Sequence, residues 1–462
     1  MRAFTFKGLF LTAVFMLLGC LSIQAADDDL ITKQITIKLD EAGTLPDRIG
    51  SSRKYQITNL KLVGEINGTD LRMIREMAGS DYYGGSTEGN LSVLDLSEAK
   101  IVIGGGDCFN GYSCYTSNDV IGNRAFSGCS RLTSLTLPAS ITRIGDDAFC
   151  CCSGLTSLTL PAGITEIGYG AFWGCSGLTS LNLPAGITSI GDDAFYGCSG
   201  LTSITLPAGI TEIGGSAFNG CSRLTSLTLP AGITSIGGGA FYGCSGLTSL
   251  NLPAGITEIG GGAFGFCSGL TSINLPAGIT SIGEYAFYGC SGLTSVTLPA
   301  GITEIGECAF YGCSGLTSLT LPAGLTQIDD YAFSECSGLT SMYVYAEKVP
   351  KIGEDVFTGC DAKKCTVYVP KGTYDDYWLS DFGYFENIVE FDATGIDKTT
   401  TSTDVKEVSR YSVNGQRLVG PTKGLNIVKY SDGSVKKVAV EIDGSQYLRI
   451  SVSQNHKSQS HS

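Results

Sequence analysis

The sequence predicts a β-rich solenoid of short stacked coils, with a cap at each end and a small β module after the second cap. Two observations predict it. First, a nearly uncharged segment of 23 residues, such as CSGLTSLTLPAGITEIGYGAFWG at residues 152–174, recurs along the chain. Second, its short apolar runs are broken by Pro and Gly, as is typical of strands and turns. A cysteine opens each copy, at Cys129, Cys152, Cys175, Cys198, Cys221, Cys244, Cys267, Cys290, Cys313 and Cys336.

One repeat is too short to bury its own apolar face. Within residues 152–174, Leu155, Leu158 and Leu160 form an L-x-x-L-x-L pattern, followed by a Pro-Ala-Gly turn and an Ala-Phe pair. Neighbouring copies must therefore stack, so that equivalent residues form columns along a shared core. We expect Leu, Ile, Phe and Cys to point inward and Thr, Ser and Asn outward. The repeat cysteines are predicted to be free buried thiols, although stacked cysteines also lie within the Cα separation that a disulfide tolerates.

The segment IGDDAFYGCSGLTSITLPAGITEIG, residues 190–214, resembles the BspA-type, or Treponema-type, leucine-rich repeat. The resemblance covers residues 120–360. It implies a leucine-rich-repeat solenoid of right-handed β-rich coils, and not the helix-backed horseshoe, because the Asn or Cys that commonly follows L-x-x-L-x-L is absent. It also implies an exported bacterial cell-surface protein.

The first 25 residues are predicted to be a signal peptide. A positive start precedes the apolar run LFLTAVFMLL at residues 9–18, and a small-residue cleavage zone follows. Cleavage near Ala25 is the preferred interpretation. The alternative is lipidation of Cys20, because LLGC at residues 17–20 resembles a lipobox. No later run approaches the roughly 20 apolar residues of a transmembrane helix, so we expect a secreted or outer-surface protein.

The flanks are predicted to close the open ends of the solenoid. Residues 26–119 form the N-terminal cap, with a strand, a helix that starts at Gly-Thr-Asp, and a leucine-patterned strand. The aromatic-rich residues 361–395 form the C-terminal cap. A Thr-rich linker follows at 396–410, a small β module at 411–453 and a disordered polar tail at 454–462. The module resembles the C-terminal sorting modules of type IX-secreted bacterial proteins, which usually end the chain, whereas 22 residues follow residue 440 here.

The charge distribution excludes a nucleic-acid partner. The whole chain carries −14, and residues 129–336 contain three arginines, no lysine and thirteen acidic residues, a net charge of −10. Nucleic acids require basic patches. One column of the repeat alternates Glu with Ser, which spaces carboxylates roughly 10 Å apart and limits their repulsion; duplication of a two-repeat block would leave the same pattern. The column comprises Glu166, Ser189, Glu212, Ser235, Glu258, Ser281 and Glu304.

The residue inventory predicts no enzyme and no cofactor. The only histidines, His456 and His461, lie in the polar tail, and no pair of carboxylates stands out as an acid and a base. The letters GGGAFG at 260–265 match a dinucleotide fingerprint, but no helix is expected after them. A thiolate zinc site at Cys150–Cys152 is a less favoured alternative. Two close pairs in the caps could be disulfides, namely Cys108 with Cys114 and Cys360 with Cys365.

Two surfaces are candidates for binding. The first is a column of small polar residues on the strand face, formed by Thr159, Asn182, Thr205, Thr228, Asn251, Asn274, Thr297 and Thr320. The second is an aromatic stripe, formed by Trp173, Tyr196, Tyr242, Tyr288 and Tyr311. We favour packing over the neighbouring coil for the stripe, with a platform for a protein or glycan as the alternative.

These observations predict a non-catalytic scaffold for adhesion and protein interaction. Its partner is expected to be a host or neighbouring-cell surface protein or an extracellular-matrix protein. One alternative is a glycan-binding surface module. The other is an architectural spacer that has no specific ligand.

Overall fold

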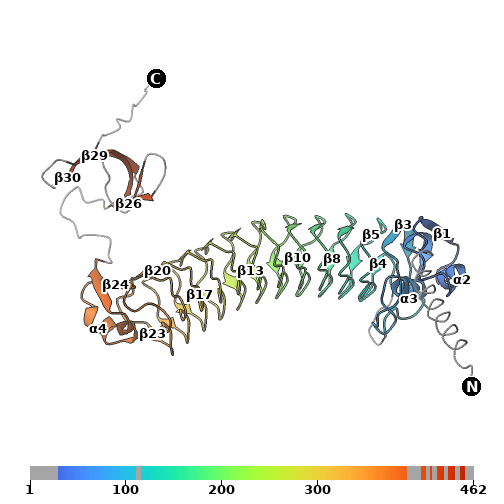
Figure 1. The fold of residues 1–462 in the computed structure, drawn as a ribbon, viewed down its shortest axis with the longest axis horizontal. Helices are drawn as coiled ribbons and strands as arrows, with labels where there is room; N and C mark the ends of the chain where they lie inside the picture. Colours follow the sequence, from blue (N-terminus) through green and yellow to red (C-terminus); the bar gives the residue numbers. More distant parts are fainter. Residues whose placement is uncertain are drawn as a thin grey trace, which may run out of the picture. The chain divides into compact units, whose positions relative to one another are not determined.

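The computed structural model describes residues 30–110 and 116–392, together with the backbone of five strands between residues 407 and 452. Residues up to 393 form one compact unit and residues from 394 another. The first unit is a parallel β-solenoid of about 15 turns, which confirms the predicted fold. Its coils stack side by side between the two caps (Figure 1).

Each regular coil contributes two short strands, which pair in parallel with the equivalent strands of the next coil. Burial alternates along both strands, so the central Leu, Ile or Val of the first strand points inward. The first column comprises β5 (Ser134–Thr136), β7 (Ser157–Thr159), β9 (Ser180–Asn182), β11 (Ser203–Thr205), β14 (Ser249–Asn251), β16 (Ser272–Asn274), β18 (Ser295–Thr297), β20 (Ser318–Leu321) and β22 (Ser341–Val344). The second comprises β4 (Val120–Ile121), β6 (Arg143–Ile144), β8 (Glu166–Ile167), β10 (Ser189–Ile190), β12 (Glu212–Ile213), β13 (Ser235–Ile236), β15 (Glu258–Ile259), β17 (Ser281–Ile282), β19 (Glu304–Ile305), β21 (Gln327–Ile328) and β23 (Lys351–Ile352).

The core is continuous, but the first strand column is interrupted. Strand pairing stops between β7 and β9, and residues 226–228 form no strand. There the Thr225 amide lies 3.5 Å from the Thr202 carbonyl oxygen, whereas the equivalent Thr202 to Thr179 distance is 2.9 Å. The strand face therefore consists of several short sheets over one shared core.

A column of stacked phenylalanines runs through that core. One Phe from each coil, from Phe126 to Phe333, is fully buried. Neighbouring ring centroids lie 5.1 to 5.6 Å apart, and the rings are parallel to within 11°. The repeat leucines, isoleucines and cysteines are buried beside them, with Leu252 partly so. The predicted inward residues are thus confirmed.

The repeat cysteines are free buried thiols, as predicted, but they also make a hydrogen bond. The Cys198 thiol donates to the Phe172 carbonyl oxygen at 3.1 Å, and the backbone amide of Cys175 donates to the same oxygen. The same bond recurs along the column at 3.0 to 3.2 Å. Burial raises the pKa of Cys198 to about 12. The thiol therefore links adjacent coils as well as filling space.

The N-terminal cap extends the solenoid sheet. It contains β1 (Ile35–Leu39), α2 (Leu45–Ile49), β2 (Asn59–Ile66), α3 (Gly68–Met77) and β3 (Val93–Ile101). The three strands are parallel and continue directly into β5 and β7. Helix α3 begins at the predicted Gly-Thr-Asp segment, and its last turn leads to the first coil.

Two buried charged residues hold this cap in place. The Asp70 carboxylate accepts hydrogen bonds from the amides of Gly43, Leu45 and Asn67 at 2.6, 2.9 and 2.9 Å, so it joins the starts of both helices. The Arg75 guanidinium donates to the Arg124 carbonyl oxygen at 2.8 Å. Arg124 belongs to the first coil edge, so Arg75 fastens the cap to the repeats.

The C-terminal cap covers the other end of the core. It contains β24 (Thr366–Pro370), α4 (Tyr374–Trp378), a 3-10 helix (Asp381–Tyr384) and β25 (Asn387–Phe391). Strands β24 and β25 extend the first strand column beyond β22. The Phe column ends where Phe357 packs against Phe382 and Phe385 at 5.1 Å.

The second unit contains a five-stranded antiparallel sheet in the order β27-β26-β28-β29-β30. Its strands are β26 (Glu407–Ser412), β27 (Arg417–Leu418), β28 (Gly424–Tyr430), β29 (Val435–Ile442) and β30 (Leu448–Val452). The sheet starts four residues before the predicted module and so shortens the expected linker. The predicted signal peptide, Cys20 and the tail at 454–462 lie outside the described residues.

Candidate functional site

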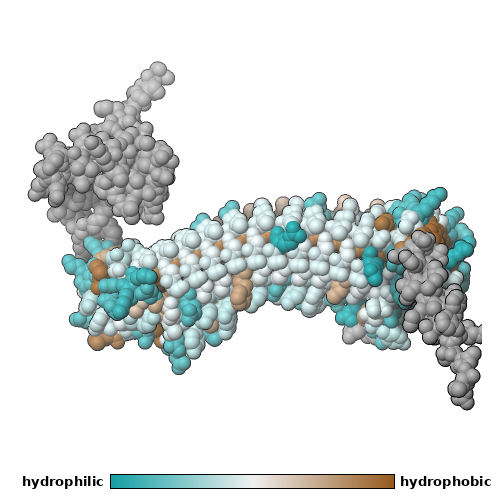
Figure 2. Space-filling view, viewed as in Figure 1, coloured by the Kyte–Doolittle hydropathy of each residue, from teal (hydrophilic) through white to brown (hydrophobic). Residues whose placement is uncertain are grey.

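The strand face presents the predicted polar column to solvent. All eight of its Thr and Asn residues are exposed. Where strands pair, the column is in register, as in the run from Asn251 through Asn274 to Thr297. The repeat surface is close to neutral in hydropathy, and the most hydrophilic residues gather toward the caps (Figure 2). The face is therefore an extended row of small hydrogen-bonding groups.

A second set of threonines holds this face rigid. The Thr156 hydroxyl donates to the Thr133 carbonyl oxygen at 3.0 Å, and the Thr202 hydroxyl donates to the Thr179 carbonyl oxygen at 3.0 Å. Similar bonds link most coils. They add side-chain cross-links to the backbone ladder, so the face is held in a fixed geometry.

The polar column ends in an aromatic cluster that sequence reasoning missed. Strand register places Tyr343 beside Thr320, and Tyr368 beside Tyr343. The two tyrosine rings stack at 4.4 Å, and Phe391 packs edge-on against Tyr345 at 5.1 Å. We call Tyr343, Tyr345, Tyr368 and Phe391 the aromatic end. Its sequence signal is a Tyr in SMYV and TVYV at the place of the repeat Thr or Asn.

The interrupted sheet opens a groove in the middle of the same face. It has a volume of about 470 Å³ and brings together Thr205 and Thr228, two of the predicted residues. Residues of 203–208 and 226–232 form its walls. The groove and the aromatic end are thus two local features on an otherwise uniform surface.

The aromatic stripe lies on the opposite turn of the coils, and its members are half-buried. Trp173 packs on Tyr196 at 4.9 Å, and Tyr288 stacks on Tyr311 at 5.0 Å with rings 7° from parallel. Phe266 joins the stripe between Tyr242 and Tyr288, at 5.3 and 5.1 Å. These contacts support the favoured interpretation that the rings pack on the neighbouring coil. A stacked ring has little free face to offer a sugar.

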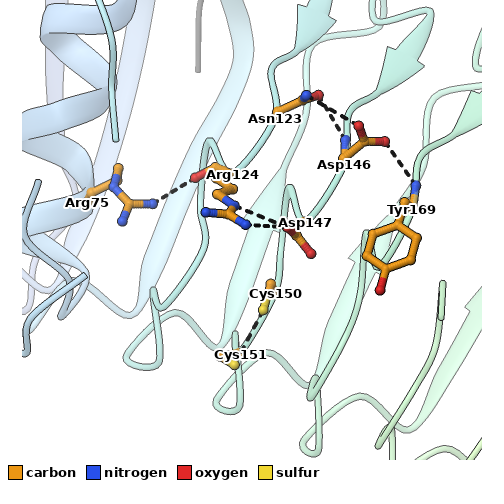
Figure 3. A network of polar contacts seen from close by, with 8 residues as sticks. All are labelled: Arg75, Asn123, Arg124, Asp146, Asp147, Cys150, Cys151 and Tyr169. Carbon is orange, nitrogen blue, oxygen red and sulfur yellow. Dashed lines mark hydrogen bonds and ion pairs between the residues drawn. The ribbon is translucent and has the colours of Figure 1, made fainter. Parts of the chain in front are cut away.

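A polar network surrounds the stripe where the solenoid meets the N-terminal cap (Figure 3). Arg124 pairs with Asp147 at 3.0 Å, and the Asp146 carboxylate accepts a hydrogen bond from the Tyr169 amide at 3.0 Å. The thiols of Cys150 and Cys151 lie beside this network, 3.4 Å apart. Within residues 30–110 and 116–392, no three or more His, Cys, Asp or Glu side chains are placed to hold a metal ion. The zinc alternative therefore has no support from this arrangement.

The two predicted cap disulfides differ in the structure. Cys108 is disulfide-bonded, and its expected partner Cys114 lies outside the described residues. Cys360 and Cys365 are both free, so the disulfide predicted between them is wrong for this structure. The physical reason is that Cys360 continues the cysteine column, since its thiol donates to the Phe333 carbonyl oxygen at 3.4 Å.

Two further sequence features take their place in the fold. Residues 260–265, which match the dinucleotide fingerprint, form the turn after β15, as the equivalent residues do in other coils. No helix in the described part of the chain is long and apolar enough to cross a membrane.

Comparisons with known proteins identify the repeat. The family described as BspA type leucine rich repeat region (6 copies) matches residues 119–248, 165–281 and 257–375. No curated protein matches the chain. Among solved structures, a leucine-rich repeat protein from Bacteroides ovatus is 25% identical over 78% of this chain and 92% of its own, with a TM-score of 0.52.

Two other solved structures share the repeat at lower TM-scores. A leucine rich cell surface protein from Faecalibacterium prausnitzii is 25% identical over 79% of this chain and 91% of its own, with a TM-score of 0.40. The Leucine Rich Repeat protein of T. pallidum is 30% identical over 40% of this chain and 78% of its own, with a TM-score of 0.32. The family match spans more than half of the 462 residues. The chain therefore belongs to the BspA-type leucine-rich repeat family.

Proposed function

We propose that this protein is an exported bacterial surface protein that acts as a non-catalytic scaffold for adhesion and protein interaction. Its binding surface is the strand face, including the aromatic end. The observation that carries this proposal is the register of the exposed column, which runs from repeat Thr and Asn residues into Tyr343 and Tyr368.

The aromatic end supplies the chemistry of a binding hot spot. Tyr343 and Tyr345 are each 36% exposed, and Val389 beside Tyr368 is 45% exposed. Tyrosine offers a large apolar area with a polar tip at low entropic cost, which is why it dominates many protein interfaces. The neighbouring Thr and Asn side chains provide a polar surround. Because backbone and threonine bonds already order the face, little conformational freedom is lost on binding.

The partner class follows from size and charge. A row of exposed residues across many coils suits an extended protein surface better than a small molecule. The acidic solenoid favours a partner with basic patches, which would raise the association rate at low salt. We assign the partner to host, matrix or neighbouring-cell surface proteins, and the location to the outer surface or the medium.

The export route is a further part of this proposal. The signal-peptide pattern at residues 1–25 supports export, with lipidation of Cys20 as the alternative to cleavage near Ala25. The antiparallel strands between Glu407 and Val452 would serve as the sorting module that their sequence resembles. Metabolic labelling with a fatty-acid analogue distinguishes the two N-terminal processing routes.

Solid-phase binding of the mature chain to matrix proteins, mucins and polysaccharides tests the proposal. We expect saturable binding to a protein, and a loss of about tenfold or more in affinity in a Tyr343→Ser, Tyr368→Ser variant. The matched control is Tyr285→Ser, an exposed tyrosine on the turn side, which should bind as the parent does. Equal losses in both variants would contradict the assigned face. Binding only to polysaccharides would favour the glycan alternative, and binding to nothing would favour the spacer.

A further inference from the structure

One coil edge carries a pair of adjacent thiols that the repeat does not require. In CCC, Cys152 is the buried column cysteine, Cys150 takes the stripe position of Trp173, and Cys151 takes the place of Gly174. Cys151 is exposed and Cys150 half-buried, and their sulfur atoms lie 3.4 Å apart (Figure 3). The two thiols thus converge at the surface.

The backbone at Cys151 is strained. Its φ is 59°, in the left-handed region that favours glycine. Most other coils place a glycine there with φ between 67° and 76°, namely Gly128, Gly174, Gly197, Gly220, Gly243, Gly289 and Gly312. A side chain in this conformation is unfavourable, and strained residues cluster at functional sites. The cysteine therefore has a cost for folding that packing alone does not explain.

The pair opens onto a groove at the junction with the N-terminal cap. The groove has a volume of about 490 Å³, and its walls include Arg124, Asp147, Tyr169 and Trp173 as well as both thiols. Arg124 places a guanidinium in this wall, and Trp173 and Tyr169 supply apolar surface. A small molecule with an anionic group has room to approach Cys151.

We propose that Cys150 and Cys151 form a redox-active dithiol that reacts with low-molecular-weight disulfides. The Cys151 thiolate attacks one sulfur of the disulfide, forms a mixed disulfide and releases one thiol after protonation. The Cys150 sulfur, having lost its proton to solvent, then attacks the Cys151 sulfur and releases the second thiol. The net reaction oxidises two cysteines to one vicinal disulfide and reduces one external disulfide to two thiols.

The geometry makes the reaction selective and reversible. The column thiols are buried and already donate to carbonyl oxygens, so an external disulfide does not reach them. Burial also raises the pKa of Cys150 to about 12, which suits the second step to the less exposed sulfur. Adjacent Cα atoms lie about 3.8 Å apart, below the roughly 4.4 Å minimum of ordinary disulfides. The product ring is strained and is readily reduced again.

Glutathione disulfide is the probe for the test. The full mature chain, first reduced mildly, is treated with it and analysed by intact and peptide mass spectrometry. We expect the peptide that contains residues 150–152 to lose two hydrogen atoms without retaining glutathione. Cys151→Gly, which restores the residue of the other coils, should lose the reaction and still fold. Cys308→Ser, at a cysteine on the same turn side without a thiol neighbour among the described contacts, should react as the parent does.

A second measurement tests the pair without oxidation. Phenylarsine oxide bridges two converging thiols, so one equivalent should bind the reduced chain about 100-fold more tightly than it binds Cys150→Ser or Cys151→Gly. A stable mixed disulfide at Cys151, no reaction with glutathione disulfide, or equal arsenical affinity in all variants would overturn the proposal.

Discussion

The inner and outer columns of the solenoid follow different rules. The phenylalanine column keeps one residue type from Phe126 to Phe333, whereas the stripe on the outer turn changes from Trp173 through Asn219 to Gly265. An inner residue packs on its own copy in the coil before and in the coil after, so it must fit both. An outer residue meets solvent on one side. The difference teaches that the interior specifies the fold, and that the variable exterior positions carry what is particular to this protein.

The strongest way to break the interior is to raise the pH. Burial raises the pKa of Cys198, Cys244 and Cys290 to about 12 each, whereas an unfolded thiol titrates near 8.5. The native thiols therefore keep their protons where the unfolded chain loses them. Their contribution to stability is complete below about pH 8.5 and falls as the pH rises toward 12. Each such thiol should cost about 2 kcal/mol between pH 8 and 10, summed over the column.

Urea unfolding at pH 8 and pH 10 measures this loss. The matched variant is Cys198→Val, Cys244→Val, which removes two titrating groups at nearly constant volume. Its stability should fall by about 4 kcal/mol less than that of the parent over the same pH range. Parallel pH profiles for the two chains would show that the column thiols do not control alkaline unfolding.

Truncation of one ring compares the two columns directly. Phe218→Ala removes a fully buried ring that stacks on Phe195 at 5.4 Å and Phe241 at 5.5 Å, and should cost about 3 to 5 kcal/mol. Tyr242→Ala removes a half-buried stripe ring, and should cost about 1 kcal/mol, since it leaves no enclosed cavity. Denaturant unfolding of both variants measures the difference. Similar losses would refute the distinction between inner and outer columns.

The sequence predicts the interior well because repetition reveals it. A 23-residue period fixes which residues are equivalent, and stacking then fixes which are buried. The second role of the cysteines was not predictable, because the thiol bond to the Phe172 carbonyl depends on the path of the coil. The groove at Thr228 has no local signal either, since SRLTSLTLP there nearly repeats neighbouring coils. It arises from how successive coils stack.

Exceptions to the repeat were harder to interpret than the repeat itself. Cys360 and Cys365 are close in sequence and suggested a disulfide, yet Cys360 belongs to the column by its bond to Phe333. Tyr343 belongs to the strand face only by register, which a changed period hides from the sequence. Where the spacing changes near the cap, sequence alone loses the alignment that made the other assignments possible.

The left-handed turn position sharpens the comparison on the outer side. Cys151→Gly relieves a positive φ and should stabilise the chain by about 1 kcal/mol. The reverse change at the equivalent position of another coil, Gly197→Cys, should destabilise it by a similar amount, because Gly197 has φ 68°. Urea unfolding under reducing conditions measures both. A loss of stability in Cys151→Gly would mean that the thiol pair itself stabilises the coil.

The smallest effect is expected where the outer column alternates charge. Ser235 lies between Glu212 and Glu258 in register, so Ser235→Glu places three carboxylates on adjacent strands about 5 Å apart. Like charges directly opposite each other are destabilising, and we expect a loss of about 0.5 kcal/mol at low salt. The isosteric Ser235→Gln variant carries no charge and separates repulsion from side-chain size. Because exposed charges are screened with a Debye length of about 3 Å at 1 M salt, the difference between the two variants should vanish there. A difference that persists at 1 M salt would exclude charge repulsion as the reason for the alternation, and would favour simple duplication of a two-coil block as its origin.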